Sequence, residues 1–253
     1  MRRRTGPVLV GILVILSSGC RPAITSSQRA EFQSIERDFT SANRPSEFLG
    51  LAQRYERLIN AGLKSGGLLY NQGNAYLNAG QRGRAIACYE QAERYRPRDR
   101  FLRANLALAR GDLPIRPADL SKRVIFWSEW ISEYEQFLLA LSAVIICVLL
   151  QQIGRWRGGI WQASVPAAIC LAFILMMAAG WSCWTHRSLQ RGVLVEPDVV
   201  ARKGSASSYE PAFEEPLPEG LPFTVVNRRS DWILGEFSGG KTGWVHSRDS
   251  IVY

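Results

Sequence analysis

The side chains that could carry out chemistry are few, and they form no reactive group in the sequence. The chain has 253 residues and only two histidines. His186 abuts an apolar segment and His246 lies near the chain end, and neither is surrounded by a recognisable nucleophile or acid–base arrangement. The glycine-rich piece Gly239-Gly240-Lys241 lacks the spacing of a phosphate-binding loop. The sequence therefore predicts a protein that is not an enzyme and needs no cofactor.

The cysteines and the net charge favour neither a metal site nor a nucleic-acid partner. The cysteines show no CxxC pair and no Cys/His cluster, so structural zinc and a disulfide framework are not expected. They are Cys20, Cys88, Cys147, Cys170 and Cys183. The net charge is +9, but the basic residues are scattered, and several flank apolar segments where they would set membrane orientation.

The first twenty residues have the three-part pattern of a secretory signal. Arginines at positions 2–4 precede an apolar run over residues 7–16, which is too short to span a bilayer comfortably, and small residues follow. The ending at Cys20 resembles a lipoprotein processing site, although Leu16 lies one place further from the cysteine than usual. We expect residues 1–20 to direct export. Lipidation of Cys20 and an ordinary signal that happens to end near a cysteine both stay open.

Residues 28–112 predict a helical repeat domain. Two helical patterns run from Leu68 to Pro97, separated by Ala79-Gly80-Gln81. Six small, aromatic or proline residues within them have the spacing of a tetratricopeptide repeat, namely Gly73, Tyr76, Ala85, Tyr89, Ala92 and Pro97. The small residues allow two helices to approach, the aromatic rings fill the space between them, and the proline ends the second helix.

One repeat cannot bury its own apolar face, so neighbouring repeats are expected. A shift of about 34 residues backwards predicts a first repeat with helices over 31–39 and 48–59. The same shift forwards predicts a capping helix over 101–109, ended by Gly111 and Pro114.

A stack of such repeats has a concave surface lined by its first helices. Tyr70, Asn74 and Asn78 would line it, with Asn71 close by. For any single asparagine the alternative is a hydrogen bond to local backbone. The surface as a whole favours binding of an extended or helical segment of a protein partner.

Residues 131–185 predict a transmembrane hairpin with spans at about 134–153 and 161–184, because each is apolar over roughly the ~20 residues that a crossing needs. The turn at 154–159 holds two arginines and no acid, which places it in the cytoplasm. Both soluble domains would then lie outside, in agreement with the export signal. The expected location is the bacterial inner membrane, multi-pass. Pro166 predicts a kink or a tolerated proline near the start of the second span.

Residues 190–253 predict a small β domain. Short β-rich runs occupy 192–195, 198–202, 223–226, 232–237 and 243–245, and residues 238–241 form a tight turn. Trp232 and Trp244 suit either a face that binds peptide or cell wall, or the core of a small domain. We favour the core for Trp244 and leave Trp232 open between the two.

Two resemblances add to this interpretation. The last domain resembles a bacterial SH3-like (SH3b) domain, most specifically in Gly240-Lys241-Thr242-Gly243-Trp244-Val245. The order of signal, repeats, hairpin and SH3-like domain resembles the BatE-type proteins of bacterial aerotolerance (Bat) operons. Tyr70-Asn71-Gln72-Gly73-Asn74-Ala75-Tyr76 and Asn105-Leu106-Ala107-Leu108-Ala109-Arg110 carry that likeness. It implies a non-enzymatic envelope component that acts with membrane-anchored von Willebrand factor A domain proteins.

The expected fold is therefore multi-domain, with an all-α tetratricopeptide repeat, a transmembrane hairpin and a small all-β SH3-like barrel. The expected function is a membrane-anchored scaffold that holds a protein partner. The alternative is a cell-wall sensor or tether that binds peptidoglycan through the SH3-like domain. The candidate contact residues are Tyr70, Asn71, Asn74, Asn78 and Trp232.

Overall fold

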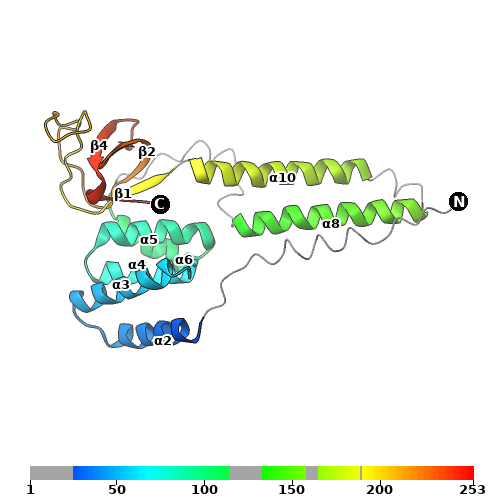
Figure 1. Cartoon of the computed structure of the whole chain (residues 1–253), viewed down its shortest axis with the longest axis horizontal. Helices are drawn as coiled ribbons and strands as arrows, with labels where there is room; N and C mark the ends of the chain where they lie inside the picture. The colour runs from blue at the N-terminus through cyan, green and yellow to red at the C-terminus, as the bar shows by residue number, and fades with distance from the viewer. Residues whose placement is uncertain (1–24, 114–132, 158–164, 189) are drawn as a thin grey trace.

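A computed structural model describes residues 25–113, 133–157, 165–188 and 190–253 (Figure 1). These residues form seven α-helices followed by a five-stranded antiparallel sheet. The predicted export signal, with Cys20 as its possible lipidation site, lies outside the described residues.

Five helices come first, and each packs on the next along the chain. They are α2 (Ser26–Ser41), α3 (Pro45–Asn60), α4 (Gly66–Asn78), α5 (Arg82–Tyr95) and α6 (Arg100–Arg110). The helices predicted over 31–39, 48–59 and 101–109, and the pair around Gly80, are confirmed. They are longer than predicted because their capping residues lie outside the apolar pattern. Thr25 caps α2, Ser65 caps α4, and Asp99 accepts hydrogen bonds from two amides at the start of α6.

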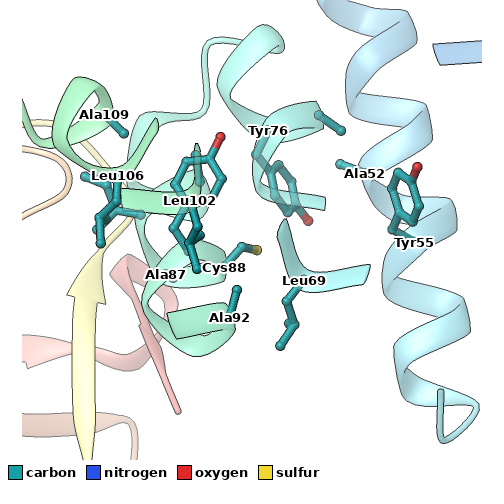
Figure 2. Packing of buried hydrophobic residues seen from close by; sticks show 14 of the residues in the cluster. Ala52, Tyr55, Leu69, Tyr76, Ala87, Cys88, Ala92, Leu102, Leu106 and Ala109 are labelled. Carbon is teal, nitrogen blue, oxygen red and sulfur yellow. The ribbon is translucent and has the colours of Figure 1, made fainter. Parts of the chain in front are cut away.

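The core of this helical unit depends on small residues facing large rings. A Cβ added at Gly73 would lie 2.5 Å from the ring of Tyr89, which is completely buried. Ala85 and Ala92 of α5 are also fully buried, so α5 lies tightly against its neighbours. Figure 2 shows the packing continuing from Tyr55 on α3, through α4 and α5, to Leu102 on α6. The five helices therefore share one core.

Two long helices follow, α8 (Glu133–Arg157) and α10 (Val165–Ser188), and they lie side by side (Figure 1). Among the described residues, Tyr134–Ile153 is the one stretch long and apolar enough to cross a membrane, with a mean hydropathy of 2.1. The second predicted span contains a shorter apolar stretch, Ala168–Ala178. Only 6% of the most apolar 18 residues of Tyr134–Ile153 is buried, so this stretch of α8 is largely uncovered in the structure.

One detail of the hairpin prediction is wrong. The turn predicted at 154–159 is helical over residues 154–157, which belong to α8. Pro166 is the second residue of α10, in agreement with the tolerated proline given as the alternative to a kink. A proline is tolerated at this position because the first turn of a helix has no partner for its N–H groups.

The sheet has the strand order β4-β3-β2-β1-β5. Its strands are β1 (Arg191–Leu194), β2 (Pro222–Arg229), β3 (Trp232–Glu236), β4 (Thr242–His246) and β5 (Ser250–Val252). Four of the five predicted runs match strands. The run at 198–202 instead forms isolated bridges, from Val199 to Leu217 and from Arg202 to Pro211 and Trp244. The three-residue strand β5 was not predicted, because it is too short to show alternation.

The preference for Trp244 as a core residue is wrong. Alternation along β4 turns Gly243 and Val245 towards the core, and Val245 is completely buried. A Cβ at Gly243 would meet Ala201 and Phe213 there. Trp244 points to the opposite face and is half-buried, so Phe223 and Phe237 supply the large core rings instead.

Candidate partner-binding surface

Asn74 on α4 is the centre of a side-chain network that joins three helices. Its Oδ1 accepts a hydrogen bond from the hydroxyl of Tyr89 on α5 (2.8 Å) and another from Nδ2 of Asn105 on α6 (2.9 Å). The same Nδ2 of Asn105 donates to the hydroxyl of Tyr70 (3.1 Å). Burial raises the pKa of Tyr89, which keeps its hydroxyl protonated as a donor. Tyr70 and Asn74 therefore hold α6 against α4.

Asn71 makes the corresponding connection towards the start of the chain. Its Nδ2 donates to Oε1 of Glu36 on α2 (2.9 Å), and the hydroxyl of Tyr55 on α3 donates to the same oxygen (3.1 Å). Burial, and then the nearby Glu36 carboxylate, raise the pKa of Tyr55. The Glu36 carboxylate therefore links α2, α3 and α4.

Asn78 behaves differently from the other two predicted asparagines. Its Nδ2 donates to the backbone carbonyl of Asn74, one turn earlier on the same helix (2.8 Å). This is the local backbone bond considered as the alternative for every asparagine here. The residue is otherwise exposed. Asn78 is therefore the predicted asparagine that can be changed without removing a hydrogen bond between helices.

The contacts of Glu36 and Asn105 with α4 add two members to this surface that were not predicted. The expected repeat spacing of about 34 residues would add Leu108 of α6, which then corresponds to Asn74. The Leu108 side chain is 73% exposed. We define the α2–α4–α6 surface as Glu36, Tyr70, Asn71, Asn74, Asn78, Asn105 and Leu108. It changes from a carboxylate on α2, through amides on α4, to an apolar side chain on α6.

A second feature that was not predicted is the packing of the sheet on α5. Residues 83, 86, 90 and 94 form one stripe at helical spacing, on a different side of α5 from Ala85, Tyr89 and Ala92. The strands β1 and β5 contact this helix (Figure 1). The small Gly83 and the apolar Ile86 are the sequence signal for packing on this side of α5, but the sequence does not show which segment they contact.

The close approach at Gly83 sets the geometry of this interface. A Cβ added there would lie 2.4 Å from the carbonyl oxygen of Leu194 and 2.8 Å from Cα of Val195, both backbone atoms of the sheet domain. The backbone N–H of Gly83 donates to Oε1 of Glu219 (2.6 Å). Gly220 lies next to Ile86 of α5 with a φ of +86°, a conformation that favours glycine. Side chains larger than hydrogen do not fit at this contact.

The last residue of the chain completes the interface. The hydroxyl of Tyr253 donates to the carboxylate of Glu90, and the guanidinium of Arg94 lies 5.4 Å from the centre of the Tyr253 ring. Glu90 also pairs with Arg110 of α6 (2.8 Å). Burial, and then Glu90, raise the pKa of Tyr253 well above 10, so its hydroxyl remains a donor. The sheet therefore covers one side of α5, and the α2–α4–α6 surface is made by other helices.

Trp232 does not join the other predicted residues. It is half-buried in β3, and its ring packs edge-on against the ring of His246 on β4, with centroids 5.4 Å apart. The register also pairs Leu234 with Trp244 on the same face of the sheet. The structure thus places Trp232 in an aromatic face of the sheet, separate from the α2–α4–α6 surface.

The described residues contain no group of three or more histidine, cysteine or acidic side chains that could hold a metal ion. The Cys88 thiol is buried, and burial raises its pKa, which leaves it a neutral packing group. No protein family, curated protein or solved structure gives a match to this chain.

Proposed function

We propose that this chain is a non-enzymatic, membrane-anchored scaffold of the bacterial envelope that binds a protein partner on its α2–α4–α6 surface. The observation that carries the proposal is the composition of this surface. It combines a carboxylate, amides and the exposed Leu108 on helices that share one core. Side chains of this kind suit a peptide segment that offers backbone hydrogen bonds and one apolar contact.

The helical unit supports assignment as tetratricopeptide repeats. Gly73 faces Tyr89, and Ala85 is fully buried, as the packing of such a helix pair requires. For the sheet, an SH3-like assignment is supported by the strand order, and by the 3₁₀ turn Ser247–Asp249 that connects β4 to β5. The tetratricopeptide and SH3-like assignments are both part of the proposed function.

The membrane arrangement in the proposal is an inner-membrane hairpin with both soluble units outside the cytoplasm. It is supported by the exposed apolar surface of α8 and by the position of the helical unit and the sheet at one end of α8 and α10 (Figure 1). The resemblance to BatE-type proteins points to membrane-anchored von Willebrand factor A domain proteins as the partners.

A second function is favoured by the aromatic face around Trp232. Two tryptophans and His246 share one face of the sheet, and aromatic rings of this kind stack well on sugars and peptides. In this alternative the chain tethers or senses peptidoglycan. Binding of the full chain to purified cell wall, lost when Trp232 is changed to Ala, would favour the tether over the scaffold.

The experiment that tests the scaffold is crosslinking of intact membranes followed by affinity capture of the full chain. The tag belongs in the exposed loop at Ser207–Ser208, because Tyr253 at the chain end is engaged with α5. Leu108→Lys should abolish capture of the partner protein. Val200→Lys, a matched change of an exposed apolar residue in the sheet domain, should leave capture unchanged. Equal capture by both variants would contradict the proposal.

A further inference from the structure

The turn between α5 and α6 is strongly basic. Five arginines and one aspartate lie between residues 94 and 103. The carboxylate of that aspartate, Asp99, is already used, because it accepts from the N–H groups of Phe101 (2.9 Å) and Leu102 (3.2 Å) and pairs with Arg96 (2.6 Å). The positive charge of Arg98 and Arg100 is therefore not balanced within the turn.

This turn is fixed next to the start of the apolar helix α8. The guanidinium of Arg98 pairs with the carboxylate of Glu135. Glu135 follows directly on Tyr134, where the stretch long enough to cross a membrane begins. If α8 crosses a bilayer, its first turn lies at the level of the headgroups. The pair with Glu135 then brings the α5–α6 turn to the same level.

The neighbouring turn of the helical unit lies at the same end. The backbone of Gly66, at the start of α4, contacts the side chains of Tyr95 and Arg96, since a Cβ added there would lie 2.8 Å from each. Lys64 comes just before it and is exposed. We define the basic end of the helical unit as Lys64, Arg96, Arg98, Arg100 and Phe101.

Phe101 adds an apolar side chain to this end. It is 62% exposed, and the guanidinium of Arg100 lies over its ring, 4.7 Å from the centre. An exposed aromatic ring beside arginines is the combination that suits the boundary between water and lipid, where the ring contacts acyl chains and the cations contact phosphate.

We propose that the basic end rests on anionic phospholipid headgroups of the bilayer that α8 crosses. This inference depends on the membrane anchoring in the proposed function. The helical unit would then contact the membrane directly, in addition to being connected through the chain to α8. The contact would fix the orientation of the helical unit relative to the membrane, and so the direction in which the α2–α4–α6 surface is presented.

The test uses the full chain in lipid nanodiscs, with the photoreactive residue p-benzoylphenylalanine in place of Phe101. After irradiation, phospholipid adducts are measured by mass spectrometry in discs of phosphatidylcholine with and without phosphatidylglycerol. We expect adducts at position 101 that increase at least several-fold with phosphatidylglycerol. The double change Lys64→Gln and Arg100→Gln, which leaves the Arg98–Glu135 pair in place, should remove most of this increase. The same photoreactive residue at Tyr209, an exposed aromatic residue in the sheet domain, should give none.

A further position separates failure of this inference from failure of the anchoring. The same residue at Leu149, an exposed position within the apolar stretch of α8, should give adducts in both lipid compositions. Adducts at 149 without adducts at 101 would overturn the headgroup contact and leave the anchor intact. Adducts at 101 that do not depend on phosphatidylglycerol would also overturn it. An absence of adducts at 149 would contradict the anchoring itself.

Discussion

The hydroxyl of Tyr253 donates a hydrogen bond to the carboxylate of Glu90, across 163 positions of sequence. The backbone carbonyl of Tyr253 also accepts from the guanidinium of Arg94 (3.4 Å). The last residue of the chain is thus bonded to the second half of α5. Because the sheet packs on this helix, the helical unit and the sheet domain form one body.

Removing the Tyr253 hydroxyl should loosen the sheet from α5. In Tyr253→Phe the Glu90 carboxylate loses a donor but keeps Arg110, so we expect a cost of about 1–2 kcal/mol. Hydrogen exchange of the β1 and β5 amides, measured on the full chain in nanodiscs, should become faster by about tenfold. Tyr209→Phe, at an exposed tyrosine, is the control and should have no effect. Equal exchange in both variants would show that the contact does not hold the sheet.

Gly83→Ala should have a larger effect on the same interface. The added methyl would lie 2.4 Å from the Leu194 carbonyl oxygen, and backbone atoms on both sides cannot give way as a flexible side chain can. Gly67→Ala is the matched control, since it lies in α4 with nothing within 4 Å of the added Cβ. We expect Gly83→Ala to expose β1 to hydrogen exchange, and Gly67→Ala to leave that exchange unchanged. Protection of β1 in both variants would contradict this packing.

The helix pair α4–α5 can be tested in the same way. In Gly73→Ala the new methyl meets the ring of the fully buried Tyr89, which has no room to move, so we expect a loss of about 1–3 kcal/mol of stability. Gly50→Ala, on α3 with nothing within 4 Å, should instead gain up to about 1 kcal/mol from helix propensity. Thermal unfolding followed by circular dichroism checks both. A gain in stability at both positions would mean that Gly73 does not contact Tyr89.

The contact between α2 and α3 should weaken in acid. The guanidinium of Arg54 hydrogen-bonds Glu31 (2.8 Å) and Asp38, and these bonds lower the pKa of both carboxyl groups. These ion pairs stabilise the folded state fully when the pH is above the ordinary pKa values, which are 4.5 for Glu31 and 3.8 for Asp38. The stabilisation is lost as the pH falls through the lower pKa values that the two carboxyl groups have in the folded state. Arg54→Met should flatten this acid dependence of α2 hydrogen exchange. An unchanged pH profile in Arg54→Met would contradict the role of the ion pairs.

The helices could be predicted because their signals are local. Gly73, Tyr89 and Pro97 have the relative positions expected in a tetratricopeptide helix pair. A shift by one repeat length then predicted α2, α3 and α6, with errors only at the capped ends. The repeat spacing could not predict the hydrogen bonds around Asn74. The spacing places Asn105 one repeat from Asn71, but the structure shows that it bonds Asn74 and Tyr70. Which neighbour an amide bonds depends on tertiary packing.

Other features depend on partners that are distant in sequence. Gly83 meets the backbone of Leu194, 111 positions further along the chain, and no local pattern around Gly83 indicates that contact. Trp244 was misplaced because a strand reverses the direction of its side chains at every residue, so an error of one residue exchanges core and surface. The need of a small domain for large core side chains favoured the tryptophan, whereas the sheet register turns its neighbour Val245 towards the core.

The most direct test of the central claim is photocrosslinking in intact membranes from position 78, with p-benzoylphenylalanine in place of Asn78. This residue is exposed on the α2–α4–α6 surface, and its side-chain hydrogen bond stays within α4. The account predicts an adduct with a protein, which disappears when Leu108→Lys is added. The same photoreactive residue at Gln53, an exposed position on α3, should not form it. An absence of any protein adduct from position 78, or an equal adduct from position 53, would contradict the claim that this surface holds the partner.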